Sequence, residues 1–281
     1  MIVKPDMITF LGNFELDHPE GVCVGPDGTV YAGGELGQFY RIQPDGSYEQ
    51  FAKTEGFILG LALDGQGSLH ACDCKSNCIW RVYAGGRIEK RSEGTDDVRM
   101  ANPNYPVFDR EGNLFVSNSG DYFNHDPGDG NVMVIRPDGA TEMFHAGPFL
   151  FANGLAIDPD HTYLYIAQTT AFNVVRIPLQ QANGPVEVVF QFPQHTLVDG
   201  LCFAADGRLL VTCYRPDKCF IGNADGTTEE FVNDVTGELL NVPTNCALHD
   251  GKVYFASLGG WNISVMDTDM QPAPTYRPEL P

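Results

Sequence analysis

One short phrase recurs six times along this chain of 281 residues. It has a polar or small lead residue, several apolar positions, a tight Asp/Gly turn and a β-rich run ending in a small residue. The lead residues are 39, 45, 49, 46 and 45 positions apart, and they are Glu20, Leu59, Asn104, Asn153, Asp199 and Thr244. A period of about 40 to 50 residues with several short strands in each repeat is typical of β-propeller blades, whose innermost strands line a central channel. We therefore predict an all-β protein, a six-bladed β-propeller with four antiparallel strands per blade.

Turn residues and strand composition support this architecture. Asp206-Gly207 is typical of a tight hairpin between the first two strands of a blade, and Pro137-Asp-Gly139 of the outer hairpin. We expect residues 7–11 to pair beside residues 263–266, so that the two ends of the chain close the ring and leave no open edge. We expect one domain over residues 1–281, with an irregular, Pro-rich tail over residues 270–281.

Composition limits the partners that the chain can have. Asp and Glu total 37 and Lys and Arg total 17, so the net charge is −20. That charge repels phosphate backbones and anionic membranes, which argues against nucleic acid and membrane surfaces. With no targeting segment in the sequence, we expect a cytoplasmic protein that is a monomer or a weak homo-oligomer.

Eight cysteines are spread along the chain, and we expect them to be reduced thiols. Cys72, Cys74 and Cys78 lie within seven residues, but their spacing matches no standard zinc site. We therefore interpret these three as packed or surface thiols.

The six lead residues should form a ring at one mouth of the channel, because each occupies the same place in its repeat. Glu20, Asn104, Asn153 and Asp199 offer oxygen atoms, which hard divalent cations prefer. A cation would also neutralise two carboxylates that share a narrow channel. The alternative is that Asp, Asn and Glu stand here only because they favour turns before strands.

Six phrases of the sequence resemble the senescence-marker-protein, gluconolactonase and luciferin-regenerating-enzyme family of six-bladed propellers. They are His18-Pro-Glu-Gly21, Pro103-Asn104, Ala152-Asn-Gly-Leu155, Val198-Asp-Gly-Leu201, Cys213-Tyr-Arg-Pro-Asp217 and Pro243-Thr-Asn-Cys-Ala247. The resemblance covers nearly the whole chain. It implies that Glu20, Asn153 and Asp199 hold one divalent metal ion, with Ca²⁺ as the first choice and Mg²⁺, Mn²⁺, Zn²⁺ or Fe²⁺ as alternatives. It also makes Asp199 the catalytic carboxylate.

The expected substrate-binding residues surround that ring. Asn104 would contact metal or substrate, and its neighbours Asn102 and Tyr105 replace the charged residues that many relatives have in an Arg-Pro-Asn-Asp segment. Asp121, in a loop long enough to overhang the mouth, could reach substrate, although a plain surface loop explains it equally well. His18 lies two residues before Glu20 and could line the mouth.

The function implied by the resemblance is metal-dependent hydrolysis of a small lactone, a sugar-acid lactone or a related one. Asp199 would act as a general base toward water or as a nucleophile, and the sequence leaves both open. Two alternatives remain: hydrolysis of organophosphate or aryl esters at the same metal site, and a propeller that binds a ligand or protein without catalysis. No Gly-x-Ser-x-Gly segment is present that would provide a serine nucleophile.

Overall fold

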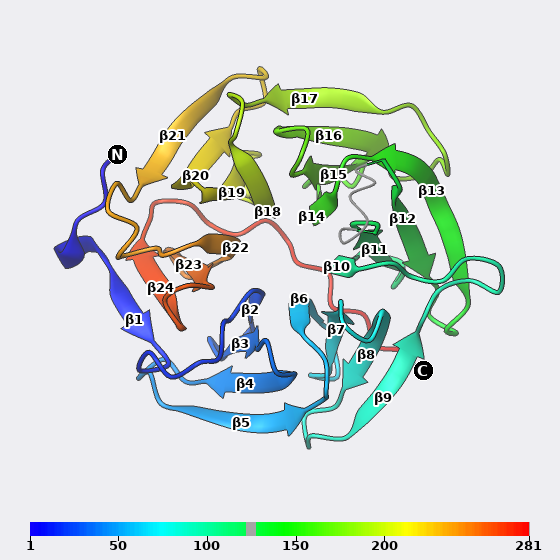
Figure 1. The fold of residues 1–281 in the computed structure, drawn as a ribbon, viewed down its shortest axis with the longest axis horizontal. Coiled ribbons are helices and arrows are strands. Elements are labelled where there is room, and N and C mark those ends of the chain that lie inside the picture. The colour runs from blue at the N-terminus through cyan, green and yellow to red at the C-terminus, as the bar shows by residue number, and fades with distance from the viewer. Residues whose placement is uncertain (122–127, 281) are drawn as a thin grey trace.

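The computed structural model describes residues 1–121 and 128–280. Six sheets of four antiparallel strands surround a central channel, as Figure 1 shows. Apart from the strands, the described residues contain only a short 3-10 helix at Pro5–Met7. The prediction of an all-β, six-bladed propeller is confirmed.

Each blade runs from an inner strand at the channel to an outer strand at the rim. Blade 1 contains β2 (Val22–Val24), β3 (Val30–Gly33), β4 (Gln38–Ile42) and β5 (Tyr48–Lys53), and blade 2 contains β6 (Ile58–Leu63), β7 (Leu69–Asp73), β8 (Cys78–Val82) and β9 (Ile88–Ser92). Blade 3 contains β10 (Pro103–Phe108), β11 (Leu114–Asn118), β12 (Gly130–Ile135) and β13 (Thr141–Phe149), and blade 4 contains β14 (Ala152–Ile157), β15 (Tyr163–Gln168), β16 (Asn173–Pro178) and β17 (Glu187–Gln191). Blade 5 contains β18 (Leu197–Phe203), β19 (Leu209–Arg215), β20 (Asp217–Gly222) and β21 (Thr228–Asn233).

Blade 6 is assembled from both ends of the chain. It contains β22 (Pro243–His249), β23 (Lys252–Ser257), β24 (Asn262–Asp267) and, as its outer strand, β1 (Thr9–Leu11). Thr9 pairs with Val265 and Leu11 with Ile263. The predicted closure of the ring by N- and C-terminal strands is therefore confirmed, and it removes the open sheet edges that a linear array of blades would leave.

The hydrophobic core lies between the faces of neighbouring blades. One buried cluster joins Val22, Ala32 and Tyr40 of blade 1 to Ile263 and Val265 of blade 6. Strands whose two faces are both covered are expected to carry apolar residues on both, and β6, Ile58–Leu63, is an example. Within the described residues, no helix is long and apolar enough to cross a membrane.

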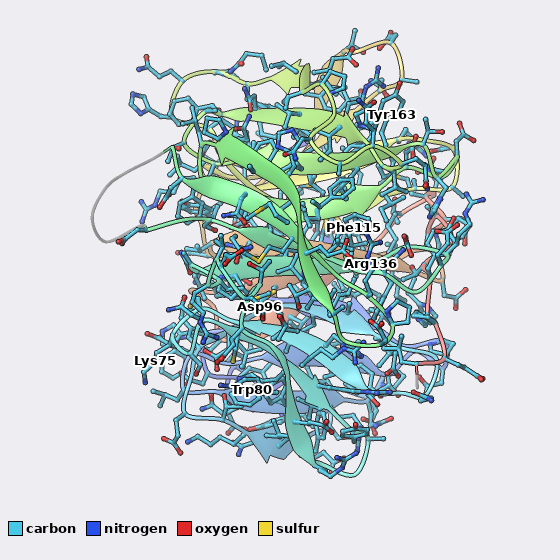
Figure 2. The ribbon with its side chains drawn as sticks, turned by 90° about the vertical axis from the view of Figure 1, so that its right-hand side faces the viewer. Lys75, Trp80, Asp96, Phe115, Arg136 and Tyr163 are labelled. Carbon is cyan, nitrogen blue, oxygen red and sulfur yellow. The ribbon has the colours of Figure 1, made fainter. Side chains whose placement is uncertain are left out.

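The two ends of the channel differ. We call the end where the inner strands begin the site end, because the lead residues lie there, and the opposite end the tail end. In the side view of Figure 2, Lys75 and Asp96 lie toward the site end, and Arg136 and Tyr163 lie toward the tail end. Each blade joins its first two strands at the tail end, by turns such as the one in which Gly28 has a φ of 83°.

Residues 270–280 form a tail that crosses the tail end of the channel without regular strands (Figure 1). Ala273 donates its backbone N–H to Phe203 O in blade 5, and Arg277 donates from Nη2 to Val24 O in blade 1. Gly65 of blade 2 donates to Pro278 O, and Leu280 is buried. The tail is thus irregular but bonded to several blades.

Candidate metal centre

Five inner strands, all except β2, share an irregularity at the lead positions. In the pairing of β14 with β15 the register shifts between Ala152 and Leu155, and in the pairing of β18 with β19 it shifts between Val198 and Leu201. The same shift occurs in β6, β10 and β22. A bulge of this kind breaks the strict alternation of side chains and can redirect one of them. The lead residues Asn153 and Asp199 lie inside these bulges.

Glycines next to the lead residues let neighbouring inner strands approach closely. A Cβ atom added to Gly154 would lie 2.4 Å from Asp199 O, and one added to Gly21 would lie 2.3 Å from Leu59 O. Both distances are too short for any real side-chain carbon, so only glycine fits. These glycines therefore let the backbones of neighbouring inner strands lie close together, which brings the lead side chains closer to the axis of the channel.

Two carboxylates of the ring are buried close to each other. Glu20 is 5 % exposed and Asp199 is 3 % exposed. Burial, and then the charge of Asp199, raise the pKa of Glu20 well above its usual value. Burial also raises the pKa of Asp199 well above its usual value, and a hydrogen bond from Asn153 partly opposes that rise. A cation between the two groups would allow both to ionise.

The two carboxamides of the ring are oriented by hydroxyl groups. Asn104 donates from Nδ2 to Ser119 Oγ over 3.2 Å, and Asn153 donates from Nδ2 to Thr169 Oγ1 over 3.0 Å. Ser119 in turn donates to Ala152 O, and Thr169 to Val198 O, on the next inner strand. The hydroxyl groups thus bind the NH₂ group of each amide and leave its Oδ1 without a hydrogen-bond partner.

The backbone of Glu20 is held from blade 6. Thr244 donates from Oγ1 to Glu20 O over 2.7 Å, and Asn245 donates from Nδ2 to the same oxygen over 3.1 Å. Thr244 is a lead residue whose hydroxyl is thus engaged with the backbone. It positions the Glu20 segment, and the sequence alone did not suggest that role.

The ring contains buried oxygens that have no hydrogen-bond partner. They are Glu20 Oε2, Asn104 Oδ1, Asn153 Oδ1 and Asp199 Oδ1. Four unpartnered buried oxygens, contributed by blades 1, 3, 4 and 5 to one ring, would be costly in a site with nothing to bind. Carboxylate and carboxamide oxygens are the donor set of hard divalent cations, so these residues fit a Ca²⁺ or Mg²⁺ ion.

The other expected site residues lie in different places. Asn102 has a positive φ of 55°. Its backbone N–H donates to Asn77 Oδ1 over 2.8 Å. Tyr105, 9 % exposed, follows Asn104 in the bulge and lines a cavity toward the tail end. Burial first, and then nearby thiols and the charge of Glu20, raise the pKa of Tyr105 well above its usual value, so its hydroxyl lies within electrostatic range of the ring.

His18 is half-buried at the site end. Its Nδ1 lies 2.9 Å from Asp17 Oδ1 and 3.1 Å from Glu35 Oε2, and its ring contacts Trp261 with centroids 4.8 Å apart. Asp17 also accepts hydrogen bonds from the backbone of Leu36 and from Gln38. The close approach of His18, Asp17 and Glu35 is thus explained by hydrogen bonds.

Asp121 is partly exposed after β11, and its backbone N–H donates to Asp129 Oδ2 over 2.8 Å. The middle of the loop to which it belongs, residues 122–127, lies outside the described residues. All eight cysteines are free thiols. Cys72 and Cys78 are buried in strands and Cys74 is half-buried, in agreement with packed thiols.

Sequence reasoning missed the supporting hydroxyls of Ser119 and Thr169. Each stands two residues beyond the end of its repeat, after Ser117 and Ala167, and each belongs to a repeat led by asparagine. A Ser or Thr at this offset is the signal that could have revealed them.

Comparison with known proteins identifies the family of this chain. Residues 35–257 match the model of the SMP-30/Gluconolactonase/LRE-like region. The chain belongs to this family. Lactonase drp35 of Staphylococcus aureus is 26% identical over 125 residues, which are 43% of this chain and 38% of that protein. The chain thus aligns with well under half the length of this curated relative.

Solved structures share the fold of this family member at low sequence identity. A gluconolactonase from Xanthomonas campestris has a TM-score of 0.79 at 18% identity, with 92% of this chain and 89% of that chain covered. Regucalcin of Agrobacterium tumefaciens, described as a calcium-binding protein, has a TM-score of 0.79 at 14% identity, with 97% of both chains covered. At these identities the likeness establishes the six-bladed propeller and not the activity.

Proposed function

We propose that this protein hydrolyses a small lactone with the help of one divalent metal ion, Ca²⁺ in the first instance. Glu20, Asn153 and Asp199 would hold the ion, and Asn104 would contact the ion or the substrate. The observation that carries this proposal is the set of four buried, unpartnered oxygens, two of them from carboxylates that repel each other. The lactonase and gluconolactonase among the relatives support the reaction class, and regucalcin supports calcium.

The chemistry of lactone opening suits these residues. A divalent ion at this position would polarise the lactone carbonyl and increase the acidity of a water molecule. Asp199 Oδ1, buried and without a hydrogen-bond partner, is available to accept the proton of that water. Asn104, with its NH₂ held by Ser119, presents its oxygen to a substrate hydroxyl. Burial of the ring excludes bulk water and strengthens each of these interactions.

The test is a hydrolysis assay on metal-depleted protein. A pH indicator would follow acid release from a panel of sugar and alkyl lactones, aryl esters and phosphotriesters after addition of Ca²⁺, Mg²⁺, Mn²⁺, Zn²⁺ or Fe²⁺. We expect lactone opening that depends on metal and is lost in Asp199→Asn. Preference for phosphotriesters or aryl esters would contradict the substrate class. If Ca²⁺ stabilised the fold but no ester were opened, the protein would be a non-catalytic binding propeller.

A further inference from the structure

The cavity that Tyr105 lines lies in the channel between the inner strands and the tail. Its volume is about 440 Å³, within the range of small-molecule sites. Apolar residues such as Leu63, Leu155 and Phe203 line its wall, and Tyr276 and Arg277 of the tail cover it. Glu20, Asn153 and Asp199 are not part of its lining. The cavity thus adjoins the ring on its tail side but does not include these candidate metal ligands.

The lining of this cavity carries no acidic residue among the described residues that form it. This is unusual in a chain of 37 acidic and 17 basic residues. The thiol of Cys23 and the phenol of Tyr105, both in the wall, are neutral as well. Burial raises the pKa of Cys23 to about 12, although Arg277 acts in the opposite direction, and burial raises the pKa of Tyr105 well above its usual value.

Arg277 brings a positive charge to this wall. Its Nη2 donates to Val24 O over 2.8 Å, and its Nε is buried without a hydrogen-bond partner. Within residues 1–121 and 128–280, no carboxylate forms an ion pair with this guanidinium. A guanidinium with a free N–H in apolar surroundings favours an anionic oxygen, above all a carboxylate.

We propose that the tail-end cavity binds a small organic monocarboxylate with an apolar body. The carboxylate accepts hydrogen bonds from Arg277, and the apolar body fills the space between the inner strands. The ligand enters beside the tail, and its binding needs no metal ion. This proposal does not depend on the lactone hydrolysis proposed above.

Calorimetry on chelator-treated protein tests the proposal, with octanoate as the probe and octanamide as its neutral analogue. We expect octanoate to bind more tightly than octanamide. Arg277→Gln should weaken octanoate binding by about tenfold or more and change octanamide binding little. Lys252→Gln is the matched control, because it removes a positive charge from the same end of the molecule, where Lys252 pairs with Asp267. That control should bind octanoate like the wild type.

A second variant covers the case in which Arg277→Gln does not fold. Ala247→Leu adds volume to the cavity wall and leaves Arg277 in place, so it should reduce binding of both probes. Absence of octanoate binding to the wild type would overturn the proposal. Equal affinity of wild type and Arg277→Gln would also overturn it, as would loss of binding in Glu20→Gln, which would locate the ligand at the metal centre.

Discussion

Replacing Glu20 by Gln separates two effects of Glu20 and Asp199 on stability: their mutual repulsion without metal and their binding of Ca²⁺. In metal-free protein, burial raises the pKa of both groups, and the charge of Asp199 adds to the rise at Glu20. Their contribution to stability is therefore full at low pH and is lost as the pH rises through the raised pKa values. Gln at position 20 does not ionise and removes the repulsion. In chelator at pH 8, we expect Glu20→Gln to unfold at or above the temperature of the wild type.

Calcium should reverse this order. At a Ca²⁺ concentration one hundred times the Kd, binding stabilises the wild type by about 2.7 kcal/mol, or roughly 5 °C in Tm for a chain of this size. Glu20 is one of only two carboxylates in the ring, so its loss should weaken Ca²⁺ binding on the order of 100-fold. At the same Ca²⁺ concentration the variant would then gain about 0.4 kcal/mol, roughly 1 °C.

Thermal unfolding followed by circular dichroism, at pH 6 and pH 8 with chelator or CaCl₂, measures both effects. Glu35→Gln is the control, since it removes a half-exposed carboxylate at the same end of the channel. Equal Ca²⁺ stabilisation of wild type and Glu20→Gln would refute the reasoning.

Asp199→Asn should keep part of the Ca²⁺ affinity and lose most turnover, whereas Glu20→Gln should lose Ca²⁺ affinity first. Equal losses of both properties in the two variants would contradict that division of roles.

Three further predictions concern the surroundings of the ring and one buried histidine. Gly154→Ala should destabilise the protein by about 1–3 kcal/mol in denaturant unfolding, whereas Gly85→Ala, with nothing within 4 Å of the added carbon, should be nearly neutral. Thr169→Val should weaken Ca²⁺ binding about tenfold in calorimetry, because Asn153 loses its hydroxyl partner, and unchanged affinity would contradict this role. Burial lowers the pKa of His70, so the unfolded state binds a proton more readily than the folded state. The free energy of unfolding should therefore decrease as the pH is lowered below about 6.5, measured by chemical denaturation. A free energy of unfolding that does not change with pH would be inconsistent with a neutral buried ring.

Local chemistry explains why the fold was predictable from the sequence. Asp-Gly pairs such as Asp206-Gly207 determine a turn within a few residues, and the structure has the turn between β18 and β19 at that pair. Aromatic and β-branched residues favour a strand in the same local way, and the third strand of blade 1, Gln38–Ile42, contains Phe39, Tyr40 and Ile42. Ring closure was predictable because a strand before the first repeat had no other partner.

The rest of the site depends on contacts between residues far apart in sequence. The bulge at Asn104 turns Tyr105 toward the tail-end cavity, and strict strand alternation does not predict that direction. The hydroxyls of Ser119 and Thr169 act on side chains of their own blade and on carbonyls of the next one. Arg277 meets Val24 across 253 residues, through a tail path that composition alone does not specify.

Sharing the sixth blade between both ends of the chain also affects synthesis. During translation β1 (Thr9–Leu11) leaves the ribosome long before its partner β24 (Asn262–Asp267) is made. A nascent chain can therefore complete five blades and still expose two unpaired edges for the time needed to make the last one. Such edges attract other strands, so the interval before β24 is made is the period in which this propeller is most prone to aggregate.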